Sequence, residues 1–204
     1  MNNKSILIAT ANRGKAKEIK EIFKDTDFDL KFLFDFPEEF KDLKILENAK
    51  SFEGNALIKA IVSGELMKMI VLADDSGFCV DALNGRPGVY SARYSEEGTD
   101  QANYLKIIEE MSGVEIRTCH YNCTVAIYDP QTKFVDTVFG TWQGKIALEP
   151  KGEKSFGYAP IFLAKEFDYQ KTNAELDHEE LIAINHRGKA FKKAIKVLNE
   201  YLKK

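Results

Sequence analysis

Two adjacent carboxylates, Asp74 and Asp75, are the side chains of this sequence best suited to chemistry. A short apolar run, residues 69–73, leads into them, and Ser76-Gly77 follows. The pattern predicts a strand that ends at the aspartates and a turn after it. Because neighbouring strand residues point in opposite directions, one carboxylate would face a cleft while the other braces the turn. A carboxylate in such a place can hold a hard cation such as Mg²⁺.

A second polar group follows the first apolar segment, Ile6–Ala9, which is typical of a buried strand. The turn after it contains Thr10 and Asn12, and a helix is expected from about Lys15 to Lys24. A helix amino terminus with a lysine beside it is a natural anion site, suited to phosphate. A capped helix start without a ligand explains the same residues equally well.

A third group surrounds the start of a long helix expected over Phe52–Met67. Ser51 is a good cap for this helix, Glu47 lies just before it and Lys59 lies on it. The helix should bury one apolar stripe, comprising Ala56, Leu57, Ala60 and Ile61. The simpler interpretation of Ser51 is capping alone, and that of Lys59 is a solvated surface lysine.

Two late segments combine glycine, aromatic and basic residues. Residues 155–162 are glycine-turned and aromatic-rich, so Phe156 could stack on a planar ring. His186 and Arg187 precede a final helix expected over residues 188–202, and both can donate hydrogen bonds to a base oxygen or a phosphate. Packing of the loop on the core, and capping by Asn185, are the structural alternatives.

Length and charge limit the classes of function. With 204 residues the chain suits one substantial domain, and 29 basic against 32 acidic residues give a net charge of −3. This balance argues against nonspecific nucleic-acid binding. No apolar run approaches the roughly 18 to 20 residues of a membrane span, and the first residues lack the layout of a signal peptide. We therefore expect a cytoplasmic protein without a membrane or nucleic-acid partner.

The three cysteines do not form a convincing zinc site. Residues 119–123 read Cys-His-Tyr-Asn-Cys, but strand alternation puts Cys119, Tyr121 and Cys123 on one face and His120 on the other. The sequence offers no second ligand pair elsewhere. We expect these two cysteines and Cys79 to be reduced, buried thiols.

The remaining pattern indicates an α/β fold. A second strand is expected near Leu30–Phe34, a helix near Asp100–Met111, and two long strands near residues 117–128 and 134–146. The turn sequence at residues 129–133 should join the last two strands in a hairpin. Early strand–helix alternation with a late hairpin predicts a mixed sheet with helices packed on it.

Taken in order, six motifs resemble those of the inosine/xanthosine triphosphate pyrophosphatase family. They are Thr10–Lys15, Ser51–Ala56, Ala73–Gly77, Gly85–Tyr94, Phe156–Phe162 and His186-Arg187. Each motif is weak by itself, but their order and their spread from Ile6 to about Leu202 make the resemblance strong.

The resemblance implies a Mg²⁺-dependent enzyme that hydrolyses ITP, dITP and XTP to the monophosphate and pyrophosphate. It implies one ITPase-like domain over residues 1–204, with an elongated mixed sheet, two lobes around a central nucleotide cleft, and assembly as a homodimer. Asp75 would be the catalytic carboxylate and Glu47 a second metal ligand, with Asp74 supporting them. The implied phosphate ligands are Thr10, Asn12, Lys15, Lys59 and Ser76. The implied base-binding residues are Phe156, Gly157, Tyr158, Ala159, His186 and Arg187.

Departures from the family pattern lie at the base end of this implied site. Ala159 stands where the family usually has Asp, Leu181 where it usually has Lys, and Asn185 where it usually has Ser. We hypothesise that the missing Asp and Lys form a coupled pair in the family, since losing both leaves no unpaired buried charge. Gly54 also replaces a frequent Glu. Two alternatives stay open: the same chemistry on dUTP-like or modified nucleotides, and a nucleotide-binding protein without catalysis.

Overall fold

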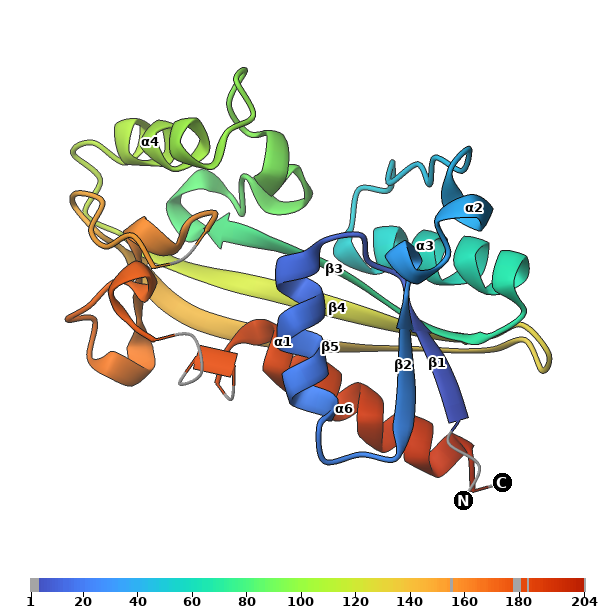
Figure 1. Ribbon diagram of the computed structural model, residues 1–204. Coiled ribbons are helices and arrows are strands. Elements are labelled where there is room, and N and C mark those ends of the chain that lie inside the picture. The colour runs from blue at the N-terminus through green and yellow to red at the C-terminus, as the bar shows by residue number, and fades with distance from the viewer. Residues whose placement is uncertain (1–3, 155, 178–180, 183, 204) are drawn as a thin grey trace. The chain divides into compact units, whose positions relative to one another are not determined.

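The protein combines a central sheet with helices that precede, follow and cover its strands (Figure 1). The structure, a computed structural model, describes residues 4–154, 156–177, 181–182 and 184–203. The strands are β1 (Lys4–Ile8), β2 (Phe28–Phe32), β3 (Ile70–Val80), β4 (Thr118–Asp129), β5 (Phe134–Ile146) and β6 (Phe162–Ala164). The α-helices are α1 (Arg13–Phe23), α2 (Pro37–Phe40), α3 (Phe52–Met67), α4 (Asp100–Glu110) and α6 (His186–Tyr201).

The sheet is mixed, with the strand order β2-β1-β3-β4-β5-β6. The first three strands of this order, at one edge of the sheet, are parallel, since β1 pairs in parallel with both β2 and β3. Ile8 thus lies opposite Phe32 and Leu72. At the other edge β6 pairs antiparallel with β5. The neighbouring strands β4 and β5 are joined by residues 130–133, as predicted for a hairpin. The α/β fold expected from the sequence is confirmed.

The chain divides into two compact units that interleave along the sequence. Of the described residues, unit 1 holds 4–75, 123–140 and 187–203, and unit 2 holds those within 76–122 and 141–186. Strands β3, β4 and β5 each contribute residues to both units. The single domain over residues 1–204 stays a prediction.

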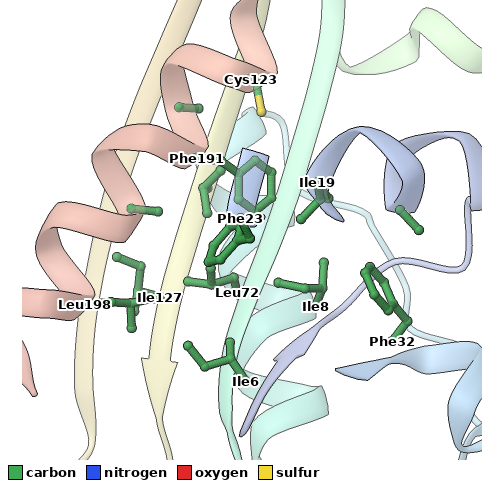
Figure 2. Packing of buried hydrophobic residues seen from close by; sticks show 14 residues of the cluster. Ile6, Ile8, Ile19, Phe23, Phe32, Leu72, Cys123, Ile127, Phe191 and Leu198 are labelled. Atoms are coloured by element: carbon green, nitrogen blue, oxygen red, sulfur yellow. The ribbon is translucent and has the colours of Figure 1, made fainter. Parts of the chain in front are cut away.

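In unit 1, alternate strand residues pack against different helices. Ile8 and Leu72 belong to a buried cluster with residues of α1 and α6, whereas their neighbours Leu7 and Val71 belong to a cluster with α3. Figure 2 shows the first cluster, in which the rings of Phe23 and Phe191 meet edge to face at 6.1 Å. Burying a side chain of this size stabilises the fold by roughly 1.5–3 kcal/mol. The strand alternation therefore decides which helix a given side chain can reach.

Strand β3 corrects one prediction that concerned the site directly. The expected strand end at Asp74-Asp75 and the turn at Ser76-Gly77 do not exist, because β3 continues without interruption to Val80. The strand is flanked by β1 and β4 in the sheet, and this pairing outweighs the turn preference of a Ser-Gly pair. The two aspartates thus lie in the middle of a strand and are held by the sheet.

The other boundaries differ by small shifts. Helix α1 begins at Arg13 because the side chain of Asn12 accepts the Lys15 amide hydrogen bond and caps it. Strand β2 ends at Phe32, where a short 3₁₀ turn begins and the Asp35 carboxylate accepts the Phe32 N–H at 2.8 Å. The ends of α4, β4 and α6 lie within two residues of their predicted positions.

Helix α3 has the predicted bounds, and Ser51 caps it by accepting the Gly54 N–H at 3.1 Å. Its buried face differs from the predicted stripe: Leu57 is half-buried and Ile61 is 39% exposed. The residues that are buried are Asn55, Ala56, Ala60, Ser63 and Gly64. Small residues bring the helix close to the sheet, since a Cβ at Gly64 would lie 2.7 Å from the Tyr128 ring.

Unit 2 has its own apolar core. Phe78, Trp142 and Phe162 lie at its centre together with Ile107 of α4. Cys79, Cys119 and Cys123 are buried, as expected. None of the helices formed by the described residues has both the length and the apolar character that a bilayer crossing requires.

Candidate active site

Asp74 and Asp75 point to opposite faces of β3 and therefore meet different helices. The side chain of Asp74 contacts Lys15 of α1 and Arg187 of α6, and that of Asp75 contacts Asn55 and Lys59 of α3. The predicted opposition of the two carboxylates is confirmed, although no turn is involved. Each aspartate is the centre of its own group of charges.

Asp74 is the centre of a buried ionic group. Its side chain is 1% exposed, and its Oδ2 lies 2.8 Å from Lys15 Nζ and 3.8 Å from Arg187 Nε. Burial by itself would raise the pKa of Asp74, but the positive charges of Lys15, Arg187 and Lys59 hold it well below its usual value. Asp74 therefore stays ionised at any pH at which the protein works.

A fourth residue, Glu18, completes this group. Arg187 Nη1 donates a hydrogen bond to Glu18 Oε2 at 2.6 Å, and both side chains are buried. Burial lowers the pKa of Arg187, but Glu18 and Asp74 together raise it above its ordinary value. Two cations thus face two anions, which keeps the desolvated group neutral. The predicted base-reading role of Arg187 stays a prediction, since its contacts named above are with carboxylates.

Asp75 is the centre of a more open group with an excess of negative charge. Asn55 Nδ2 donates to Asp75 Oδ2 at 3.0 Å, and Lys59 Nζ lies 3.6 Å from Oδ1. The same ammonium lies 2.6 Å from Oε2 of Glu47. Burial raises the pKa of Asp75, and the negative charge of Glu47 raises it further. Lys59 and the hydrogen bond from Asn55 lower it, but the pKa stays above its usual value. One lysine thus balances two carboxylates.

This second group fits a hard divalent cation. Burial lowers the pKa of Lys59, but the carboxylates of Asp74, Asp75 and Glu47 outweigh this effect and raise the pKa above its usual value. The lysine is therefore charged, and its single positive charge leaves the group of Glu47, Asp75 and Lys59 with a net negative charge. Among the described residues, no three His, Cys, Asp or Glu side chains converge to hold a metal by themselves. Mg²⁺ is usually bound by one or two carboxylates together with substrate phosphates, so Glu47 and Asp75 suffice.

The remaining predicted phosphate ligands are Thr10 and Asn12, which follow the end of β1, and Ser76, which lies within β3. Thr10 follows β1 and accepts the Asn12 N–H at 3.2 Å through its hydroxyl, while Asn12 caps α1. The capping interpretation of this turn is thus correct, and it leaves the phosphate role as a prediction. Ser76 is half-buried and follows Asp75 in β3, in unit 2.

The predicted base-binding segment lies in unit 2; residue 155 is outside the described residues. Phe156 is 50% exposed, and Gly157, with φ +64°, donates its N–H to Asp100 Oδ2 at 2.8 Å. Tyr158 is buried, stacks on Phe78 at 4.7 Å and donates its hydroxyl to the Ser91 carbonyl at 2.7 Å. Phe156 therefore offers an open ring, whereas Tyr158 has a structural position. Ala159 is 4% exposed.

His186 begins α6, and its ring stacks on Tyr121 at 4.8 Å and 12°. Leu181, one of the departures from the family pattern, is buried in the apolar core of unit 2. Asn185, another departure, is also buried and donates its N–H to the Leu181 carbonyl at 2.8 Å. Ala159, Leu181 and Asn185 therefore occupy interior positions of unit 2.

Comparison with known proteins decides the family. The model of the Ham1 family matches residues 6–197. The chain belongs to the Ham1 family. It is 45% identical over 202 residues to the dITP/XTP pyrophosphatase of Bacillus subtilis (strain 168), covering 96% of this chain and 97% of that one. It is 40% identical to the dITP/XTP pyrophosphatase of Lactococcus lactis subsp. lactis, covering 98% and 99%.

Solved Ham1 structures agree with this fold. The Ham1 protein of Staphylococcus aureus is 35% identical, with a TM-score of 0.83 and 98% of each chain covered. A Ham1 protein from Coxiella burnetii is 34% identical, with a TM-score of 0.86 and 97% and 99% covered. The resemblance inferred from six short motifs is confirmed over nearly the whole chain.

Two residues of the site were not predicted, and each had a sequence signal. Glu18 lies in α1 three residues after Lys15 and four before Ile22, so a charge occupies the stripe that should be apolar. Asn55 is an amide next to Ala56 on the buried face of α3. A polar residue at a core position needs a partner, and here both partners belong to the site.

Proposed function

We propose that the protein hydrolyses non-standard purine nucleoside triphosphates such as dITP, ITP and XTP to the monophosphate and pyrophosphate, with Mg²⁺. The observation that carries the proposal is the contrast between Asp74, buried against Lys15 and Arg187, and Asp75, which shares Lys59 with Glu47 in a more open group. Such pairs mark acid–base assignments in enzymes. The full-length relatives named dITP/XTP pyrophosphatase support the substrate class.

Asp75 is the residue that accepts the proton. Hydrolysis of the α–β phosphoanhydride adds the water oxygen to phosphorus, breaks the bridging P–O bond and releases one proton from the water. Asp74 cannot take this proton, because Lys15 and Arg187 keep its carboxylate ionised. Asp75, whose pKa is raised, can take it and return it to solvent.

The basic residues of unit 1 bind and orient the triphosphate. The ammonium groups of Lys15 and Lys59 each lie beside a carboxylate. A phosphate oxygen can replace that carboxylate as the partner, because both are anionic oxygen acceptors. Thr10, Asn12 and Ser76 supply hydroxyl and amide groups for further phosphate hydrogen bonds. The two lysines offset the negative charge of the phosphate oxygens, which otherwise opposes attack by the water oxygen, and the neutral groups hold the triphosphate in place.

Glu47 and Asp75 would hold the magnesium ion, which supplies further neutralisation of the phosphate oxygens when bound. Phe156 would stack on the purine, and the other base-binding residues that the family resemblance implies are Gly157, Tyr158, Ala159, His186 and Arg187. Donors toward O6 favour hypoxanthine and xanthine over adenine, since a mismatched buried group costs about 1–3 kcal/mol. Assembly as a homodimer is inferred from the family resemblance, and light scattering tests it against the chain mass of 23.1 kDa. The cytoplasmic location stays an expectation from the sequence pattern.

The proposal is tested by measuring pyrophosphate release with Mg²⁺ from ITP, dITP, XTP, GTP, ATP, dUTP and dTTP. We expect the first three to be preferred, and activity to disappear with EDTA and return with excess Mg²⁺. Preference for dUTP would show that the substrates are pyrimidine nucleotides and not purine nucleotides. Tight ITP binding without turnover would instead support a nucleotide-binding protein.

Two matched variants separate catalysis from stability at the adjacent carboxylates. Asp75→Asn should fold and lose about a hundredfold or more of kcat, because it removes the proton acceptor. Asp74→Asn should mainly lower the unfolding temperature, because it leaves Lys15 and Arg187 without a buried counter-charge. A folded Asp75→Asn protein with full activity would contradict the assignment of the base.

A further inference from the structure

Asn55 of α3 connects Asp75 to the segment that carries Glu47. Its Nδ2 donates to Asp75 Oδ2 at 3.0 Å, and its Oδ1 accepts the Ala49 N–H at 2.9 Å. The residue is 2% exposed. Ala49 lies two residues after Glu47, so one buried amide holds both Asp75 and the segment that carries Glu47.

The segment can reach Asn55 because Gly54 has no side chain. A Cβ at Gly54 would lie 2.6 Å from the Ala49 Cβ and 3.1 Å from the Ser51 hydroxyl oxygen. Contacts under 3.0 Å between such atoms require one of them to move. The close approach of Ala49 to the helix, and with it the hydrogen bond to Asn55, therefore depends on the glycine that departs from the family pattern.

The hydrogen bond to Asn55 also decides which oxygen of Asp75 is available. Oδ2 is occupied by the amide, whereas Oδ1 faces Lys59 at 3.6 Å. The Glu47 carboxylate lies against the same ammonium at 2.6 Å. Both carboxylates thus face the Lys59 ammonium, and Asn55 is hydrogen-bonded to Asp75 and to the segment that carries Glu47.

We propose that Asn55 is a positioning residue for the proposed reaction: its amide aims Asp75 Oδ1 and the Glu47 segment at the same place. A side-chain amide offers a donor and an acceptor on separate atoms, and the two contacts use one of each. An aspartate there could still accept the Ala49 N–H, but it could not donate to Asp75. Substitution can therefore remove the hydrogen bond to Asp75 while keeping the one from the Ala49 N–H.

This inference rests on the proposed function, and its test uses the full chain with Asn55→Asp and Asn55→Ala. Two quantities are measured: kcat for pyrophosphate release from ITP, and the exchange rate of the Ala49 amide hydrogen by NMR without nucleotide. Asn55→Ala should lower kcat at least tenfold and speed exchange at least tenfold. Asn55→Asp should lower kcat at least tenfold while exchange stays within threefold of wild type.

Asn103→Asp is the matched control. Asn103 is also 2% exposed, and its Oδ1 accepts hydrogen bonds from the N–H and hydroxyl of Ser95, so the same change keeps the acceptor. This variant should keep kcat within twofold. If Asn55→Asp is as active as wild type, or loses Ala49 protection to the same degree as Asn55→Ala, the amide has only a structural role. A wild-type protein that releases no pyrophosphate would overturn the proposed function and this inference with it.

Discussion

Arg187 and Glu18 form a buried ion pair, with 2.6 Å between Nη1 and Oε2 and side chains 6% and 3% exposed. The pair joins the first turn of α6 to the middle of α1, 169 residues apart. Through Arg187 Nε it also reaches Asp74. The geometry of the first aspartate therefore depends on how these two helices pack on the sheet.

Replacing one residue of this pair should lower the unfolding free energy more than replacing both. Arg187→Met leaves Glu18 charged and buried, and should cost about 3–5 kcal/mol of unfolding free energy. The double variant Glu18→Leu with Arg187→Met should be more stable than Arg187→Met alone. Urea unfolding at pH 7 measures both. Additive losses would mean that the two charges do not depend on each other.

Gly54→Ala should destabilise the protein, although the same change in a helix usually stabilises it. A helix-interior alanine is favoured over glycine by about 0.5–1 kcal/mol. Here the new Cβ would meet the Ala49 Cβ at 2.6 Å and displace the segment that carries Glu47. The unfolding temperature should fall and Ala49 amide exchange should accelerate. A rise in unfolding temperature would show that the segment around Ala49 can move away from the new Cβ without destabilising the protein.

Restoring the family residues at positions 159 and 181 should sharpen base selectivity. Leu181→Lys alone places an ammonium in the apolar core of unit 2 and should destabilise the protein strongly. Adding Ala159→Asp should recover part of that stability if the two charges pair. The ratio of kcat/KM for ITP over GTP should then rise about tenfold or more. An unchanged ratio in the folded double variant would reject the coupled-pair hypothesis.

Asp129 should make stability depend on pH. Burial raises the pKa of Asp129, but hydrogen bonds from Tyr201 and the backbone around Gln131 lower it below its usual value. A depressed folded-state pKa stabilises the protein above the unfolded-state value of about 4, and this contribution is lost as the pH falls through the folded-state pKa.

The variant Asp129→Asn measures this contribution. It should be less stable than wild type by about 1 kcal/mol at pH 7, or about 2–4 °C in Tm. The difference should shrink as the pH falls below about 4. Thermal scans between pH 3 and pH 7 give both curves. A difference that does not change with pH would assign the loss to packing instead of charge.

Local patterns in the sequence were sufficient for most of the longer elements and for the family. The bounds of α3, its Ser51 cap and the hairpin of β4 and β5 follow from periodicity and turn residues within short windows. The opposition of Asp74 and Asp75 follows from strand geometry alone. Six motifs in order were enough to indicate the family, because residue types at a site are fixed by its chemistry.

The tertiary structure decided which partners these residues have. Ser76-Gly77 predicts a turn locally, but pairing with the neighbouring strands extends β3 to Val80. Arg187 meets Glu18 and Asp74, and Asn55 meets Asp75, only because α1, α3 and α6 pack at particular registers on the two faces of the sheet. Contacts between residues far apart in the chain depend on the packing of whole elements, and no local pattern contains that information.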